Sequence, residues 1–154
     1  MVNSLYENDF QLWINSTIQQ LKNGEFDSID LENLIEELTS LGKSEKNALK
    51  SNLMILLAHL LKLQVQSDAP ETMKISWYNS VIEHRQRVLT HLEDTPSLKN
   101  FIPEAMDKAY PQARNLAIKE GKFAALGVRI PGEGEYPLTC PFSIQQILDE
   151  DFYG

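Results

Sequence analysis

The chain has 154 residues, a length that fits one domain with a sizeable hydrophobic core. Hydrophobic residues make up 42% of it and charged residues 23%, which argues against wholesale disorder. The net charge is −8 and no run of Lys or Arg occurs, so the sequence argues against nucleic acid and anionic membranes as direct partners.

The cellular location is predicted from three features. Cys140 is the lone cysteine, so no intrachain disulfide can form, which fits a reducing compartment. The first ten residues lack the basic and apolar regions of a secretory signal. The longest apolar stretch, residues 53–65, contains polar residues and is shorter than the ~20 residues that span a bilayer. We therefore expect a cytoplasmic protein.

The first predicted helix begins at Ser4, which forms a capping box with Glu7, and ends at Gly24. Its apolar positions recur at steps of three and four residues and so share one face. They are Tyr6, Phe10, Trp13, Ile14, Thr17, Ile18 and Leu21.

A second helix is predicted from Asp27 or Ser28 to Gly42, where glycine would end it. Its apolar side chains form one arc and its polar side chains the opposite arc. The apolar arc contains Leu31, Leu34, Ile35, Leu38 and Leu41; the polar arc contains Asp30, Glu32, Asn33, Glu36 and Glu37.

The third predicted helix, residues 44–66, begins with Ser44 as N-cap and is apolar over most of its circumference. Such a helix must be surrounded by other elements, so we place it at the centre of a bundle. One narrow polar strip runs along it, formed by Asn52, His59, Lys62 and Gln66.

The remaining elements are a fourth helix over residues 75–94, a fifth helical region over 97–119 and an irregular tail. Pro103 and Pro111 predict that the fifth region is kinked or divided into short segments. In the tail, a second capping box opens a short helix, and residues 125–130 could form a short extended piece. The predicted fold is an all-α, single-domain bundle of about four to five main helices, with residues 1–121 as the bundle and 122–154 as a tail packed on it.

Arg85 is the most informative residue, because it lies near the middle of the apolar arc of the fourth helix. A buried guanidinium needs acceptors, and the carboxylates of the second helix are the best supply. The first interpretation is a structural bridge between Arg85 and those carboxylates. The alternatives are an anion-binding pocket and an arginine that reaches solvent. The predicted polar cluster contains Arg85, His59, Lys62, Asp30, Asn33, Glu36 and Glu37.

His59 is either a hydrogen-bonded histidine at the edge of the core or a general base or metal ligand. His84 and His91 are seven residues apart, about 10.5 Å along a helix, which is long for one shared metal ion. The two-histidine and Glu-x-x-His spacings of metal sites are absent from the sequence, so we predict no metal and no cofactor.

Several ordered motifs resemble the bacterial DUF29 family. They are Tyr6-Glu7-x-Asp9-Phe10-x-x-Trp13, residues 30–37 followed by Leu41-Gly42, His59-Leu60-Leu61-Lys62, Trp77, Arg85, Pro96-Ser97-Leu98 and Ala109-Tyr110-Pro111-x-Ala113. The resemblance implies an all-helical bundle and a bacterial, mainly cyanobacterial, source. It implies no activity and no catalytic residues, because none are established for the family.

Three functions remain open at this point. The first is a small interaction or regulatory protein that binds a protein partner or itself, with an exposed apolar patch that includes Leu12. The second is an enzyme or ligand sensor for a small molecule, with a pocket around Arg85, His59 and Glu36/Glu37. The third is a metal-dependent hydrolase of the bundle type.

Overall fold

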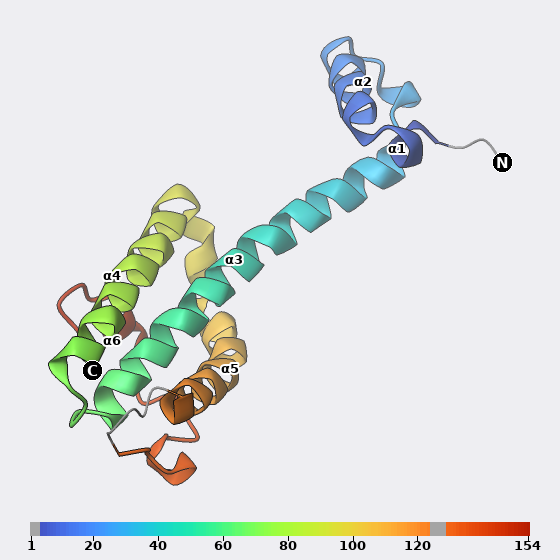
Figure 1. Cartoon of the computed structure of the whole chain (residues 1–154). Helices are drawn as coiled ribbons and strands as arrows, with labels where there is room; N and C mark the ends of the chain where they lie inside the picture. Colours follow the sequence, from blue (N-terminus) through green and yellow to red (C-terminus); the bar gives the residue numbers. More distant parts are fainter. Residues whose placement is uncertain (1–3, 124–128) are drawn as a thin grey trace. The chain divides into compact units, whose positions relative to one another are not determined.

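The computed structural model describes residues 4–123 and 129–154, and all regular structure in these two ranges is helical (Figure 1). This confirms the predicted all-α fold, with a short helix near the end of the tail. The elements in chain order are α1 (Leu5–Asn8), α2 (Phe10–Lys22), η1 (Phe26–Ser28), α3 (Leu31–Val65), α4 (Glu71–Asp94), η2 (Pro96–Phe101), α5 (Ile102–Phe123), η3 (Glu133–Glu135) and α6 (Ile144–Leu148).

The chain divides into two compact units, Met1–Ser44 and Glu45–Gly154, which we call the N-terminal unit and the C-terminal unit. The boundary falls inside α3, which contributes residues to both units. No shift in composition and no linker marks this position in the sequence, so the division was not predicted.

The N-terminal unit is a helical hairpin. The predicted first helix is divided at Asp9, whose carboxylate accepts a hydrogen bond from the N–H of Leu12 at 3.0 Å and so caps α2. The hydroxyl of Ser4 caps α1 by accepting from the N–H of Glu7. Gly24 follows α2 with φ of +72°, a left-handed conformation that glycine adopts at least cost. The predicted end of this helix is therefore confirmed.

The helix α3 runs through Gly42 without a break, so the prediction of two helices that stop and restart at residues 42–44 is wrong. Gly42 does not take the left-handed conformation that would end a helix, and good helix-forming residues lie on both sides of it. A glycine inside a helix costs only about 1 kcal/mol relative to alanine, which a helix of 35 residues tolerates.

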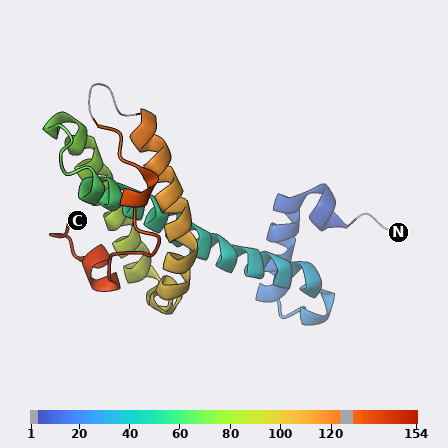
Figure 2. The same cartoon turned by 90° about the horizontal axis from the view of Figure 1, so that it is seen from below.

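The second half of α3 is the centre of the C-terminal unit, where it lies between α4 and α5 (Figures 1 and 2). By length and composition alone α3 could also cross a membrane, but core helices of soluble proteins pass the same test. Its leucines are in the core of the unit. The fully buried ones are Leu49, Leu53, Leu56, Leu57, Leu60 and Leu61.

Both flanking helices bury an apolar face in the core of the unit. Trp77, Val81 and Val88 of α4 are buried in the core. The row of alanines on α5 is also buried, and small side chains of this kind let a helix approach its neighbour closely. The row consists of Ala105, Ala109, Ala113 and Ala117.

Two boundaries of these flanking helices differ from prediction. The helix α4 begins at Glu71, about one turn before the predicted start. The fifth region is a 3₁₀ segment followed by one uninterrupted helix that includes Pro111. Pro103 lies in the first turn of α5, where a missing donor costs nothing, and Pro111 removes only one intrahelical donor.

The tail is anchored on the C-terminal unit by Tyr136, Phe142 and Ile147, all of which are buried. The predicted capping box is present, because Ser143 accepts from the N–H of Gln146 and the Gln146 side chain accepts from the N–H of Ser143. Of the predicted extended piece, residues 125–128 lie outside the described ranges, and residues 129–130 are not in a strand.

Candidate functional site

An apolar groove lies in the N-terminal unit, between α2 and the first three turns of α3. Its volume is about 470 Å³. This is within the range of ~300–1,000 Å³ that is typical of ligand pockets. We call it the hairpin groove. It is lined by Phe10, Trp13, Ile14, Thr17, Ile18, Leu21, Leu34, Glu37, Leu38, Ser40 and Leu41.

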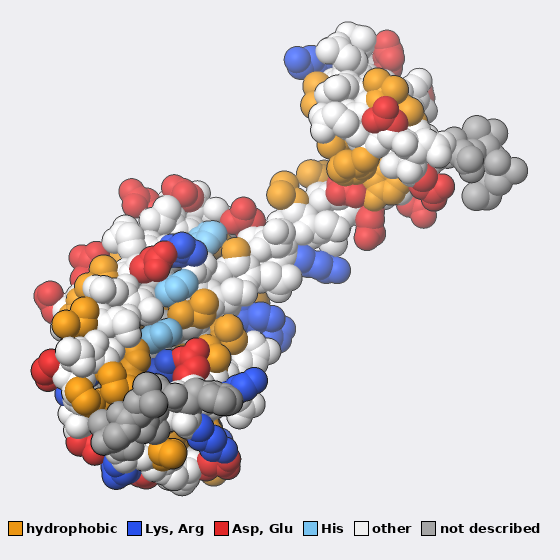
Figure 3. Space-filling model, viewed as in Figure 1, with side chains coloured by type: hydrophobic (Ala, Val, Ile, Leu, Met, Phe, Trp, Pro, Cys, Tyr) orange, Lys and Arg blue, Asp and Glu red, His pale blue; other side chains and the backbone are white. Residues whose placement is uncertain are grey.

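The hairpin leaves most of its large apolar side chains exposed. Of its described residues only Trp13 and Thr17 are buried within the structure. Leu31, Ile35 and Leu38 belong to the predicted apolar arc of the second helix, and their side chains are 56–61% exposed. The reason is that two helices leave one side of each apolar face uncovered within this unit. Figure 3 shows hydrophobic side chains at its surface among acidic ones.

An aromatic cluster and one long-range hydrogen bond hold the hairpin together. The ring of Tyr6 meets that of Trp13 edge-on at 4.9 Å, and the rings of Phe10 and Trp13 stack at 5.6 Å. The Tyr6 hydroxyl donates a hydrogen bond to the Glu37 carboxylate. This bond, together with partial burial and the charge of Glu37, raises the pKa of Tyr6 to about 12. One of the side chains that line the groove, Glu37, is therefore held by a hydrogen bond.

Four members of the predicted polar cluster belong to the N-terminal unit, and two of these are brought together. The Asp30 carboxylate accepts from the side-chain amide of Asn33 at 2.7 Å and from its backbone N–H at 3.3 Å. These bonds cap the start of α3. Glu37 binds Tyr6, and Glu36 is exposed.

Arg85 is buried in the C-terminal unit at 2% exposure, but its partners differ from the predicted carboxylates. Its Nε donates to the carbonyl of Ile147 at 2.8 Å and its Nη2 to the carbonyl of Phe152 at 2.7 Å. The guanidinium also lies 5.5 Å from the centre of the Tyr153 ring. An irregular tail has carbonyls that no helix or sheet uses, so it can supply the acceptors that a buried arginine needs.

A small pocket of about 170 Å³ lies beside Arg85. Burial lowers the pKa of Arg85, while nearby Tyr153, Asp149 and Glu150 oppose this shift. Nη1 of Arg85 has no hydrogen-bond partner among the described residues. Glu150 also lines the pocket, and its negative charge disfavours an anion there.

The two other cluster members, His59 and Lys62, occupy the polar strip of α3 in the C-terminal unit. The Nδ1 of His59 lies 2.8 Å from the carbonyl of Ile55, and the Lys62 ammonium pairs with Glu120. Burial lowers the pKa of His59. Burial also lowers the pKa of Lys62 to about 8. Lys62 is thus a buried charge with one partially exposed partner.

The three histidines form a row on one face of the C-terminal unit (Figure 3). The Nδ1 of His84 lies 3.0 Å from the side-chain oxygen of Asn52, and burial lowers the pKa of His84. His91 lies 3.9 Å from Glu45. Within residues 4–123 and 129–154, no three His, Cys, Asp or Glu side chains gather as a metal site would require.

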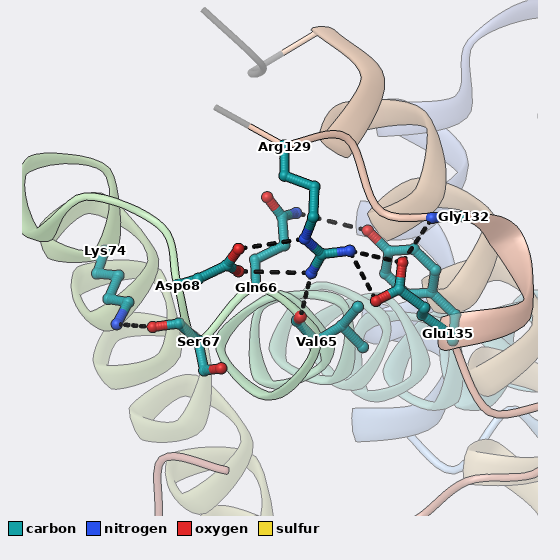
Figure 4. A network of polar contacts seen from close by, with 9 residues as sticks. Val65, Gln66, Ser67, Asp68, Lys74, Arg129, Gly132 and Glu135 are labelled. Atoms are coloured by element: carbon teal, nitrogen blue, oxygen red, sulfur yellow. Dashed lines mark hydrogen bonds and ion pairs between the residues drawn. The ribbon is translucent and has the colours of Figure 1, made fainter. Parts of the chain in front are cut away.

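One polar network was missed by the sequence analysis. Arg129 donates to Asp68 at 3.1 Å and to both carboxylate oxygens of Glu135 at 2.7 Å (Figure 4). The Glu135 carboxylate also accepts from the N–H of Gly132 at 2.7 Å. The network joins the loop after α3 to the tail. Arg129 and Asp68 are 61 residues apart in the sequence, so no local pattern indicated their contact.

Comparison with known families decides what kind of protein this is. The family model described as "Domain of unknown function DUF29" matches residues 5–153. The chain belongs to the DUF29 family. The match covers both units of this DUF29 protein, including the hairpin groove and the tail that Arg85 anchors. No curated protein and no solved structure shows significant similarity to the chain.

Proposed function

We propose that this DUF29 protein is a non-enzymatic interaction or regulatory protein of the bacterial cytoplasm, and that it binds a protein partner in the hairpin groove. The observation that carries the proposal is the groove itself, about 470 Å³ in volume and lined almost wholly by apolar side chains. Contiguous exposed apolar surface is rare on proteins that act alone, and it marks interaction sites.

The area of this surface supports a protein partner. The half-exposed apolar side chains of α2 and α3 offer on the order of 600–800 Å² of apolar surface, estimated from typical side-chain areas. One partner in a stable protein complex contributes roughly 800 Å². The side chains that count are Phe10, Ile18, Leu21, Leu31, Ile35, Leu38 and Leu41.

An enzyme or ligand sensor is the alternative, and its strongest support is the pocket beside Arg85. That support is weaker, because two nitrogens of Arg85 already bind tail carbonyls and the pocket is about 170 Å³. In addition, His59 and Lys62 are engaged by Ile55 and Glu120. Arg85 and Lys62 join different segments of the C-terminal unit, and the His59 contact lies within α3.

The proposal is tested by placing a photo-crosslinking amino acid at Leu38 in the full chain, inside cells of the source organism. Leu38 lines the groove and is 60% exposed. The matched control carries the same amino acid at Leu12, which is 51% exposed on α2 but does not line the groove. We expect a discrete crosslinked protein from position 38 and none from position 12. Equal products from both positions, or none from position 38, would contradict the proposal.

A further inference from the structure

We propose that the occupant of the hairpin groove is a basic amphipathic helix of a partner protein, with Leu- or Phe-type anchors on one face and Lys or Arg beside them. This inference rests on the proposed function and adds the chemistry of the partner. It is drawn from the charge of the N-terminal unit and from the shape of its apolar surface.

The N-terminal unit carries most of the negative charge of the protein. Residues 1–44 contain eight Asp and Glu against two Lys, a net charge of −6 out of −8 for the whole chain. All ion pairs among the described residues lie in the C-terminal unit, so no carboxylate of the hairpin has a cationic partner within 4.0 Å. The hairpin therefore presents acidic charge that is not neutralised within the unit.

The acidic side chains lie beside the apolar ones. Glu37 lines the groove. Glu32 and Glu36 are both exposed and one turn apart on α3, so they form a short row. Glu32 is about 60° around the helix from Ile35, which places this row along the exposed apolar edge of α3. A helix seated on the apolar surface would bring its flanking side chains close to these carboxylates.

The shape of the site fits a helix better than a flat surface or a small molecule. The groove runs between two helices, and a third helix packed there would complete a three-helix bundle. The 13 residues of α2 are roughly 20 Å long, which matches a partner helix of about four turns. The Phe10, Ile18 and Leu21 side chains of α2 would then contact apolar side chains of the partner helix that recur every three or four residues.

Charge also argues against a second copy of the chain as the occupant. Two hairpins that meet through this surface would each bring a net charge of −6. Like charges brought together at an interface cost several kcal/mol. A basic helix instead gains attraction from the same carboxylates, and that attraction also speeds its association.

The test uses two fluorescent 18-residue probe peptides that share one apolar face of Leu and Phe and differ only in the flanks, which carry Lys in one and Glu in the other. Binding to the full chain is measured by fluorescence anisotropy at low and physiological salt. We expect the Lys probe to bind at least ~10-fold more tightly than the Glu probe and to weaken as salt rises. Trp13 gives a second readout in a Trp77→Phe background, because it lines the groove and its emission should shift to the blue on binding.

Two double variants show which carboxylates attract the Lys probe. Glu32→Gln with Glu36→Gln removes the acidic row on the Ile35 side of α3, outside the lining of the groove. The control, Glu25→Gln with Asp27→Asn, removes the same charge from the segment between α2 and α3. We expect the first pair to weaken the Lys probe by roughly 3–10-fold and the control to weaken it less, since screening limits the reach of charge to about 8 Å. Leu38→Ser should abolish binding of either probe.

The outcomes separate this inference from the proposed function. Equal binding of both probes, lost in Leu38→Ser, would overturn the basic partner and leave the groove as a protein-binding site. Binding of neither probe, with light scattering showing a dimer that Leu38→Ser dissolves, would show that a second copy fills the groove. Binding of neither probe by a monomer would show that the chain itself covers the groove, and would overturn both proposals.

Discussion

The hydroxyl of Tyr6 binds the carboxylate of Glu37, 31 residues further along the chain, and so joins α1 to α3 inside the hairpin. The bond requires the neutral phenol as donor, which is why the pKa of Tyr6 rises to about 12. A tyrosine with a raised pKa stabilises the fold below its ordinary value near 10, and this contribution is lost as pH rises from about 10 to 12.

We therefore expect Tyr6→Phe to loosen the N-terminal unit without changing the C-terminal unit. Hydrogen exchange followed by mass spectrometry should show faster exchange in α1 and in the first turns of α3. Tyr78→Phe is the control, because the Tyr78 hydroxyl makes no hydrogen bond with any described residue. Unchanged exchange in α1 would mean that the aromatic cluster alone holds the hairpin.

Gly42 and Gly24 should respond in opposite directions to the same substitution. Gly42→Ala should raise the free energy of unfolding by about 0.5–1 kcal/mol, because the site is inside a helix and has open space for a methyl group. Gly24→Ala should lower it by about 1 kcal/mol, because φ is +72° there. Urea unfolding followed by circular dichroism measures both. Destabilisation by Gly42→Ala would indicate a helix end at residue 42 instead of a continuous α3.

Arg85→Met should destabilise the C-terminal unit by about 2–5 kcal/mol, because the buried carbonyl of Ile147 and the partly buried carbonyl of Phe152 would lose their donor. The tail that carries these carbonyls should also become sensitive to limited proteolysis. Arg87→Met is the matched control: Arg87 is on the same helix, is 57% exposed and pairs with Glu83 at the surface. A change of less than ~0.5 kcal/mol is expected for the control. If Arg85→Met left the tail protected, the anchoring role of Arg85 would be wrong.

Lys62→Met should stabilise the protein at pH 7, because Lys62 is a buried ammonium whose pKa is lowered to about 8. In the unfolded chain the pKa is about 10.4, so the cost of burying the charge is present below pH 8 and disappears as pH rises toward 10. The advantage of the variant over the wild type should accordingly shrink between pH 8 and 10. Urea unfolding at several pH values measures this difference in the free energy of unfolding.

Lys108→Met provides the comparison for Lys62, because Lys108 is 56% exposed and pairs with Glu104 on the surface of α5. Its effect should be small at every pH. An advantage of Lys62→Met that did not vary with pH would show that packing against Trp77, and not the buried charge, causes it.

The sequence predicted the helices of the C-terminal unit well because their apolar periodicity is decisive. A stretch such as residues 53–63 has leucine on most sides and can only be stable when it is surrounded. The prediction of a helix end at Gly42 was wrong because glycine is common after the last turn of a helix but is also tolerated inside one. Which of the two occurs depends on the stability of the whole helix.

The candidate site was harder to predict for a different reason. Periodicity shows that Leu31, Ile35 and Leu38 share a face, but not whether another element covers that face. The burial of Arg85 was predicted from its position on the apolar face of α4. Its acceptors were not predicted, because they are the backbone carbonyls of Ile147 and Phe152, and every residue type has such a carbonyl. The contact between Arg129 and Asp68 was not predicted because the two residues are 61 positions apart in the sequence.

The position of the boundary between the two units has an evolutionary consequence. Most domains meet in an exposed linker, where genes can be recombined without disturbing either side. Here the boundary falls between Ser44 and Glu45, within the hydrogen-bonded turns of α3. A cut or insertion at this point would break a helix that both units need, so the two halves are expected to be inherited as one piece. The family match from residue 5 to residue 153 is consistent with such joint inheritance.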